Sequence, residues 1–323
     1  MEFQVKVLFL TFILTVVLSF IIIPILKKLK VGQMEREDGP QSHLKKQGTP
    51  TMGGIIMIIG IILMSIICFI MYRIDELETI KKMIPLVLVS LGFGIVGLVD
   101  DFKKLVLKNT EGLKPSYKML GLLIISVTFA IFLYKEIGTE TLIPILKTYI
   151  SMPVWIYIPF AIFVMLGTTN AVNLTDGIDG LSTSITNIII ACLTVVGIIF
   201  GVKEVVILGS IVCGANLAFL IFNMYPAKVF MGDTGSLLLG GVIVSMALYL
   251  KMPILLIIIA LIPVLETISV MLQVTYYKKT GKRIFKMAPL HHHFELSGWN
   301  ENKVVSIFSI LTLILCVIGL NII

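Results

Sequence analysis

Two adjacent carboxylates, Asp100 and Asp101, close an apolar run and are followed by Lys103, Lys104 and Lys108. Asp100 and Lys104 are four residues apart, so an ion pair on one helix face would account for one of the two acids. A second carboxylate at the same boundary is better explained by an ion-binding or acid–base role. Because neighbouring residues on a helix diverge by about 100°, only one of the pair can face a shared site squarely if the helix continues.

The segment 170–180 (NAVNLTDGIDG) contains Asn173, Asp176 and Asp179, with a glycine after each Asp and no Lys or Arg. Capping of the next helix would require only one Asp. Two carboxylates beside glycines could instead meet a cation or the donors of a nucleoside, because glycine lets a ligand approach the backbone. We therefore favour a functional role for this segment.

The segment 223–236 (NMYPAKVFMGDTGS) begins with Asn223 and places Asp233 directly after Gly232, at the start of another apolar run. Asp233 as a helix cap would be unremarkable. The same position also suits phosphate binding, because helix N-terminal amides and glycine N–H groups point outward. Phe230 is either a core residue or a platform for a stacked base. The lysine of a P-loop is missing, so that motif is excluded.

Three consecutive histidines, His291, His292 and His293, lie between Pro289 and Glu295. Consecutive histidines do not easily converge on one tetrahedral ion, and no HExxH spacing occurs, so a zinc site is not favoured. Imidazole is better suited to phosphate contact or proton handling near neutral pH.

A further carboxylate, Glu266, falls inside an apolar run, three residues after Pro263. An intramembrane carboxylate is a functional hypothesis by default. The alternative is a hydrogen bond to backbone freed at a helix break.

Together these segments combine carboxylates, amides, lysines and histidines without a Ser or Cys nucleophile constellation. Mg²⁺ prefers oxygen ligands and commonly joins one or two carboxylates to substrate phosphates. Lysine and histidine can then stabilise charge that shifts between oxygens. The residue types therefore favour Mg²⁺-assisted phosphoryl chemistry.

The elements that position these residues are membrane-spanning helices. Hydrophobic residues make up 57% of the 323 and charged residues only 14%, against about 25% in soluble domains. This excludes a soluble enzyme, a disordered chain and a secreted disulfide scaffold. Runs near the 17–25 residues that a span requires predict an all-α polytopic membrane protein, a single domain over 1–323, with about ten transmembrane helices. The predicted spans are 3–26, 51–72, 83–99, 119–134, 153–172, 183–201, 205–222, 235–250, 252–275 and 304–323.

Basic residues predict the orientation of these spans. Alternate loops hold 18 of the 26 Lys and Arg residues, and all four histidines. Since cytoplasmic loops collect positive charge, we expect both termini outside and the active site on the cytoplasmic face. The net charge of +7 then reflects topology, and no nucleic-acid partner is expected.

One motif has a purely structural interpretation. Residues 92–97 (GFGIVG) match the GxGxxG dinucleotide fingerprint, but that fingerprint requires a preceding strand. Inside an apolar helix the glycines instead predict close helix packing.

The four polar segments, in this order, resemble the signatures of the polyprenyl-phosphate N-acetylhexosamine-1-phosphate transferases. The loop 36–54 (REDGPQSHLKKQGTPTMGG) and the run 289–295 (PLHHHFE) are similar to the branch that acts on UDP-MurNAc-pentapeptide. The resemblance covers essentially the whole chain. It implies transfer of phospho-MurNAc-pentapeptide to undecaprenyl phosphate in the bacterial cell membrane, giving lipid I and UMP for peptidoglycan synthesis. It also implies Mg²⁺ as cofactor and a homodimer.

The resemblance assigns roles to individual residues. Asp233 would bind Mg²⁺, with Asp176 as a second candidate ligand, and Asp100 or Asp101 would lie near the lipid phosphate. The remaining substrate contacts that it implies are Lys46, Asn223 and Phe230 on the uridine side, Asn173, Asp176 and Asp179 on the nucleotide side, Lys104, Lys108 and Lys118 at phosphates, and His291, His292 and His293 by the pyrophosphate, with Gly232 as a further substrate-binding residue.

Two other functions are compatible with parts of this pattern. A sister enzyme that takes UDP-GlcNAc is disfavoured by the HHHFE and REDGP runs. A membrane transporter would place its functional acids near the bilayer midplane, whereas these acids share one face. A direct displacement is preferred over a covalent aspartyl-phosphate, which the sequence leaves open.

Overall fold

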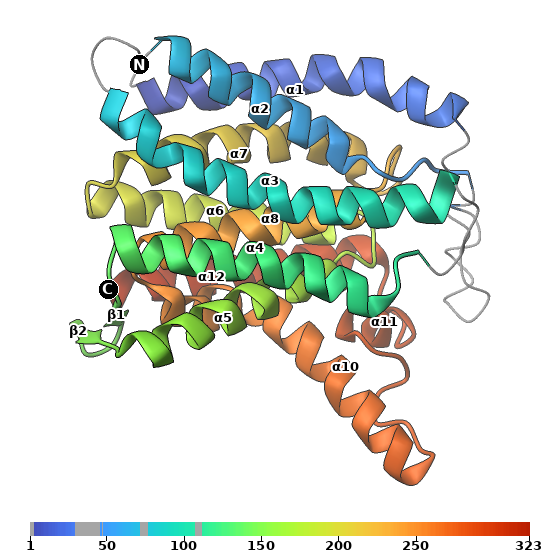
Figure 1. Cartoon of the computed structure of the whole chain (residues 1–323). Helices are drawn as coiled ribbons and strands as arrows, with labels where there is room; N and C mark the ends of the chain where they lie inside the picture. The colour runs from blue at the N-terminus through green and yellow to red at the C-terminus, as the bar shows by residue number, and fades with distance from the viewer. Residues whose placement is uncertain (1–2, 30–45, 47, 72–76, 107–111) are drawn as a thin grey trace.

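The computed structural model describes residues 3–29, 46, 48–71, 77–106 and 112–323. Long helices dominate it (Figure 1). The helices are α1 (Phe3–Lys28), α2 (Gly54–Met71), α3 (Leu77–Val106), α4 (Pro115–Glu136), α5 (Val154–Thr175), α6 (Leu181–Ile199), α7 (Lys203–Asn223), α8 (Gly232–Tyr249), α9 (Leu256–Ile259), α10 (Leu261–Thr280), α11 (Leu290–Glu295) and α12 (Glu301–Asn321), with a 3-10 turn at Pro253–Leu255.

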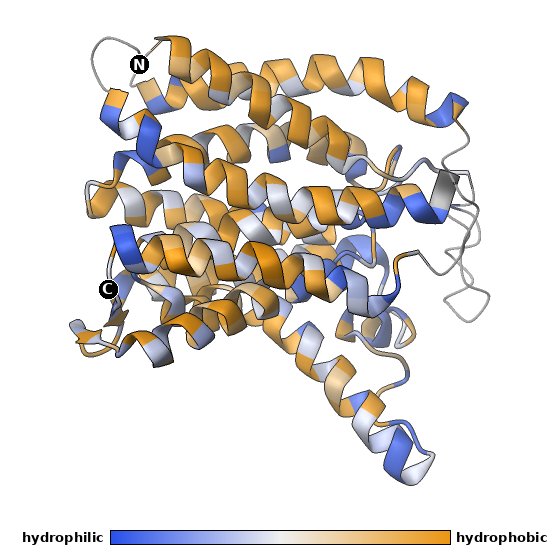
Figure 2. Cartoon of the chain, in the orientation of Figure 1, coloured by the Kyte–Doolittle hydropathy of each residue, from blue (hydrophilic) through white to orange (hydrophobic). Residues whose placement is uncertain are grey.

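The predicted all-α membrane architecture is confirmed. Among the described residues nine helices are long and apolar enough to cross a membrane, and a bent pair makes a tenth. Figure 2 shows apolar residues along the long helices, whereas hydrophilic residues gather near the end of α3, near α11 and at the tip of α10.

Helix α8 forms the centre of the bundle. It contacts α2, α3, α5 and α6, and 89% of its residues are buried inside the bundle. The predicted role of the GFGIVG glycines is confirmed here. A Cβ on Gly94 would lie 3.2 Å from the Cβ of Leu238 on α8, and one on Gly97 would collide with the backbone carbonyl of Asp233. Glycine therefore lets the backbone of α3 touch the first turn of α8.

Both termini lie at the same end of the bundle, and the loops that carry the polar segments lie at the other (Figure 1). A two-stranded antiparallel hairpin, β1 (Glu140–Ile143) and β2 (Thr148–Ser151), also lies at the terminal end, with Glu140 paired with Ser151. The sequence did not predict this hairpin, because its strands are only four residues long. The inside and outside faces of the bundle stay a prediction.

Two predicted spans differ from the observed helices. The third was expected at 83–99 but extends to Val106, so Asp100 and Asp101 lie inside a helix and not at its end. The ninth was expected as one span over 252–275, but the chain breaks at Ala260 and the two parts are bent by 81°. Helix α10 consequently projects away from the bundle (Figure 1).

Candidate active site

Asp233 lies in the first turn of α8, where side chains from three other helices converge on its carboxylate. Its Oδ1 accepts a hydrogen bond from Asn173 Nδ2 of α5 at 2.9 Å. Its Oδ2 accepts from Lys104 Nζ of α3 at 2.9 Å and from Lys118 Nζ of α4 at 2.8 Å. Four of the predicted site residues, distant in sequence, therefore meet at one carboxylate.

Asp100 and Asp101 both reach the start of α8, but by different routes. Asp100 Oδ2 pairs with Lys104 Nζ at 2.7 Å, and its Oδ1 accepts from the backbone N–H of Leu113 at 2.7 Å. Asp101 accepts from the backbone N–H groups of Asp233 (3.2 Å) and Thr234 (2.9 Å), and from the Thr234 hydroxyl (2.6 Å). As the helical geometry predicts, the two acids diverge: Asp100 faces the lysines, and Asp101 caps α8.

Gly232 is required between these groups. Its φ is +72°, a conformation that glycine adopts without strain. A Cβ at this position would also lie 2.6 Å from Asp101 Oδ2. The glycine thus permits the cap that Asp101 forms.

Asp176 is the C-cap residue of α5, begins the turn that follows this helix, and belongs to the same group of acids. Burial and the nearby charges of Asp233, Asp101 and Asp179 raise the pKa of Asp176 to about 8. A carboxyl that retains its proton because other acids surround it is a natural position for a cation.

Asp179 belongs to a second, buried ion network. Lys46 Nζ lies 2.7 Å from Asp179 Oδ1 and 2.7 Å from Glu301 Oε2, and Asp179 Oδ2 accepts from the backbone N–H of Ala227 at 2.9 Å. Burial alone would lower the pKa of Lys46, but its hydrogen bonds to the two carboxylates raise it. Glu301 was missed by sequence reasoning, because a Glu in the first turn of a helix is an ordinary feature.

Asn223 and Phe230, expected on the uridine side, flank Ala227, the residue whose backbone N–H bonds to Asp179. Asn223 is buried and bonds on both sides: it accepts from the Thr183 hydroxyl at 2.6 Å and donates to the Val229 carbonyl at 3.0 Å. The backbone N–H of Phe230 donates to Pro50 at 2.8 Å, and its carbonyl accepts from Gly53 at 2.8 Å. These bonds attach the 223–236 segment to the chain that precedes α2.

The three histidines of α11 lie in different surroundings. His291 is fully buried, His292 Nδ1 lies 2.9 Å from Glu295 Oε2, and His293 Nδ1 accepts from the backbone N–H of Lys286 at 3.2 Å. Lys108, predicted to contact a phosphate, lies outside the described residues, as does most of the loop 36–54.

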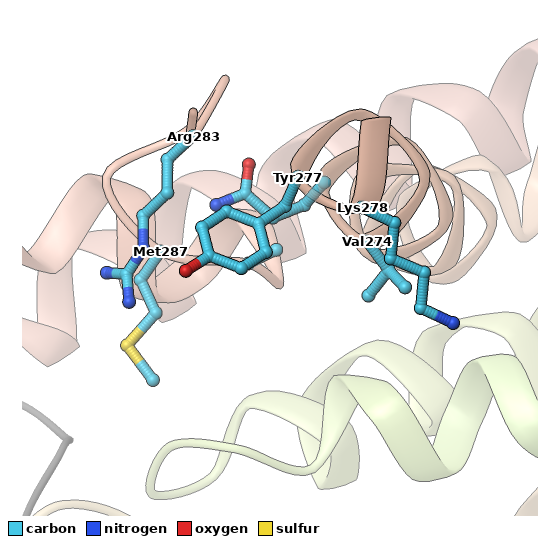
Figure 3. A pocket seen from close by; sticks show the side chains of 7 residues that line it. Val274, Tyr277, Lys278, Arg283 and Met287 are labelled. Atoms are coloured by element: carbon cyan, nitrogen blue, oxygen red, sulfur yellow. The ribbon is translucent and has the colours of Figure 1, made fainter. Parts of the chain in front are cut away.

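A separate pocket of about 370 Å³ opens between the distal half of α10 and the chain that leads to α11. Tyr277, Arg283 and Met287 surround it, with Val274 and Lys278 on the helix (Figure 3). None of the predicted site residues that the structure describes lines this pocket. It lies next to Ala288, three residues before His291.

Comparison with known proteins identifies the family. Residues 83–251, just over half of the chain, match the model of glycosyl transferase family 4. A phospho-N-acetylmuramoyl-pentapeptide-transferase of Clostridium botulinum is 50% identical over 309 residues, covering 95% of this chain and 93% of the relative. The enzymes of that name from Clostridium perfringens (96% and 95% covered) and Acetivibrio thermocellus (98% and 94%) are 50% and 45% identical. The chain belongs to the phospho-N-acetylmuramoyl-pentapeptide-transferase family.

The two kinds of similarity cover different parts of the site. The glycosyl transferase family 4 match includes the acids from Asp100 to Asp233, whereas Lys46, His291 and Glu301 lie outside it. The transferase relatives align along nearly the whole chain. The acids from Asp100 to Asp233 therefore fall within the broader family's segment, whereas Lys46 and Glu301, the partners of Asp179, lie beyond it.

The described residues suit a metal that takes part of its coordination from substrate. They contain no group of three His, Cys, Asp or Glu side chains that could hold an ion alone. The donors that lie together are carboxylates, and Asp233 already attracts two lysine ammonium groups. Oxygen donors of this kind, one or two in number, fit Mg²⁺, which keeps waters and binds substrate phosphates.

Proposed function

We propose that this chain transfers phospho-MurNAc-pentapeptide from UDP-MurNAc-pentapeptide to undecaprenyl phosphate, forming lipid I and releasing UMP. The observation that carries the proposal is the convergence of Asn173, Lys104 and Lys118 on Asp233, beside the Asp100–Asp101 pair. Anionic oxygen donors and cations at one helix N-terminus suit a substrate that is both metal-bound and phosphorylated. The names of the relatives support the choice of substrate.

Mg²⁺ is the proposed cofactor. Asp233 and Asp176 would hold it, since the two acids belong to one carboxylate group. When bound, Mg²⁺ would neutralise the pyrophosphate and stabilise charge that develops on the leaving UMP.

In the proposed reaction an oxygen of the lipid phosphate attacks the β-phosphorus of the UDP-sugar. The new P–O bond joins the two phosphates of lipid I, and the bond between the β-phosphorus and the bridging oxygen breaks as UMP leaves. Asp100 would receive any proton from the lipid phosphate, because its Oδ2 faces Lys104 and Lys118, the cations that would contact the phosphates, whereas Asp101 bonds to the start of α8. In a direct displacement Asp101 would keep its hydrogen bonds to the start of α8. An aspartyl-phosphate remains the alternative mechanism.

The cations around Asp233 would contact phosphates when substrate binds. Lys104 and Lys118 lie within 3 Å of the Asp233 carboxylate, so a short movement of their side chains would bring them to a bound phosphate. His291, His292 and His293 would lie near the pyrophosphate, with Lys46, Asn223 and Phe230 on the uridine side. Homodimer formation, which the family resemblance implies, is part of this proposal.

A UMP-release assay tests the function. Purified protein in detergent would be mixed with undecaprenyl phosphate and Mg²⁺, and separately with UDP-MurNAc-pentapeptide or UDP-GlcNAc. We expect UMP and a lipid-linked product from UDP-MurNAc-pentapeptide only. Release of UMP from UDP-GlcNAc alone would favour the sister activity, and no release from either would be expected of a transporter.

A further inference from the structure

Glu266 is a fully buried carboxylate that the proposed reaction does not use. It lies in α10, six residues beyond the break at Ala260, and has no exposed surface. A buried charge is costly unless hydrogen bonds compensate it. The partner of this carboxylate therefore indicates its role.

That partner is the start of α11. The N-cap residue of α11 is Pro289, which makes no side-chain cap hydrogen bond. The backbone N–H of His291 instead donates to Glu266 Oε1 at 3.2 Å, with Oε2 at 3.4 Å. A carboxylate of one helix therefore caps the next, as Asp101 does for α8.

The same carboxylate also lies against the His291 ring, with Oε2 at 3.3 Å from Nδ1. The far side of the ring touches the acid-rich turn after α5, because a Cβ on Gly177 would collide with His291 Nε2. Neither ring nitrogen has a hydrogen-bond partner among the described residues. The ring is thus held between Glu266 and the residue that follows Asp176.

We propose that Glu266 is a positioning residue that fixes His291 against the Asp176–Asp179 turn. This inference rests on the proposed function, because it concerns the same site. A carboxylate that only satisfied backbone freed by the break would bond within α9 or α10. Its contacts are instead with His291, in the helix that follows the connection from α10 to α11.

The experiment compares Glu266→Ala and Glu266→Gln with Thr267→Val in the UMP-release assay. Thr267 is the matched control, because within the described part of the chain its hydroxyl bonds only to the Pro263 carbonyl of its own helix. We expect Glu266→Ala to lower kcat by about 10- to 100-fold, as misplacement of a reacting group does. KM for the nucleotide substrate should change by less than about threefold, since its uridine side is held elsewhere. Thr267→Val should keep the wild-type kcat.

Coupling to His291 separates positioning from general destabilisation. In a His291→Ala background, Glu266→Gln should lower kcat by less than about twofold, because its effect passes through the missing ring. An equal loss in both backgrounds, or a wild-type kcat in Glu266→Ala, would overturn the inference. If Glu266→Ala does not fold, Glu266→Gln in the wild-type and His291→Ala backgrounds provides the same comparison. Thermal unfolding and size-exclusion profiles show whether each variant is folded. An inactive wild-type protein would contradict the proposed function itself.

Discussion

The Asp101 carboxylate caps the helix that carries Asp233, by accepting hydrogen bonds from both the backbone N–H and the hydroxyl of Thr234 at 2.9 and 2.6 Å. The N-cap residue of α8 is Met231, which makes no side-chain cap hydrogen bond. A negative charge at a helix N-terminus also interacts favourably with the helix dipole. Asp101 therefore determines where α8 begins, and with it the position of Asp233.

Loss of this cap should destabilise the protein. We expect Asp101→Asn to lower the free energy of unfolding by about 1.5–3 kcal/mol, because hydrogen bonds to a charged acceptor are replaced. Thr234→Val should lower it less, because the backbone bonds remain. Thermal unfolding in detergent measures both. Ser90→Ala is the control, since its hydroxyl bonds mainly within α3 to the Leu86 carbonyl; an Asp101→Asn protein as stable as wild type would contradict the capping role.

Replacement of Asp233 should remove the metal site. Asp233→Asn retains the shape of the side chain but loses the charge that attracts Lys104, Lys118 and the proposed Mg²⁺. We expect turnover to fall by a factor on the order of 100 or more, and Mn²⁺ binding, followed by electron paramagnetic resonance, to weaken. Glu140→Gln is the control, because Glu140 is an exposed residue of β1 at the terminal end of the bundle, where it pairs with Lys251. Unchanged Mn²⁺ affinity in Asp233→Asn would refute the ligand assignment.

The close approach of α3 and α8 should not tolerate a methyl group at Gly97. Its Cβ would meet the backbone of Asp233 and Thr234, which cannot rotate away as a side chain can. We expect Gly97→Ala to cost about 1–3 kcal/mol of stability and to lower kcat by moving Asp233. Gly92→Ala is the comparison, because its Cβ would meet only the flexible Ile125 side chain at 3.3 Å. Equal kcat in the two variants would show that this contact does not position the acid.

Lys46 and Glu301 should contribute unequally to the stability of their buried ion network. Lys46→Met leaves Asp179 and Glu301 without their shared cation, and removal of one partner from a buried pair costs about 3–5 kcal/mol. Glu301→Gln should cost less, because Lys46 keeps Asp179. The double variant Lys46→Met/Glu301→Gln should be more stable than Lys46→Met alone, because the uncompensated charge of Glu301 is removed. Denaturation of all three proteins measures the coupling, and strict additivity would argue against a network.

Asp176 should make the stability of the metal-free protein depend on pH. Its folded-state pKa of about 8 exceeds the value of about 3.9 for an unfolded Asp. The folded protein therefore holds a proton that the unfolded chain has lost, and stability falls as pH rises from about 4 to about 8. Melting temperatures in EDTA between pH 5 and 9 should show this slope, and Asp176→Asn should flatten it. An identical slope in the two proteins would contradict the raised pKa.

The long helices and their polar ends were predictable, because both depend on local composition. Apolar runs of about 20 residues must form helices in a bilayer, where every backbone N–H and C=O must bond within the segment. The acids that interrupt those runs, from Asp100 to Asp233, were visible for the same reason: charge is rare in this chain. The packing role of the GFGIVG glycines was predictable because the run lies within an apolar helix, where small residues let another helix approach.

The partners of these residues depended on tertiary structure. Lys46 and Glu301 are 255 positions apart, and no local pattern relates Glu266 to His291 or Asp101 to Thr234. The sequence allowed a helix break near Pro263, but its position at Ala260 and its bend of 81° were not predicted, because the apolar run continues through it. Sequence by itself determined which segments cross the membrane and which residue types could do chemistry. Only the packed bundle decided that α8 and α11 are capped by carboxylates of other helices, because such bonds require backbones that folding alone brings together.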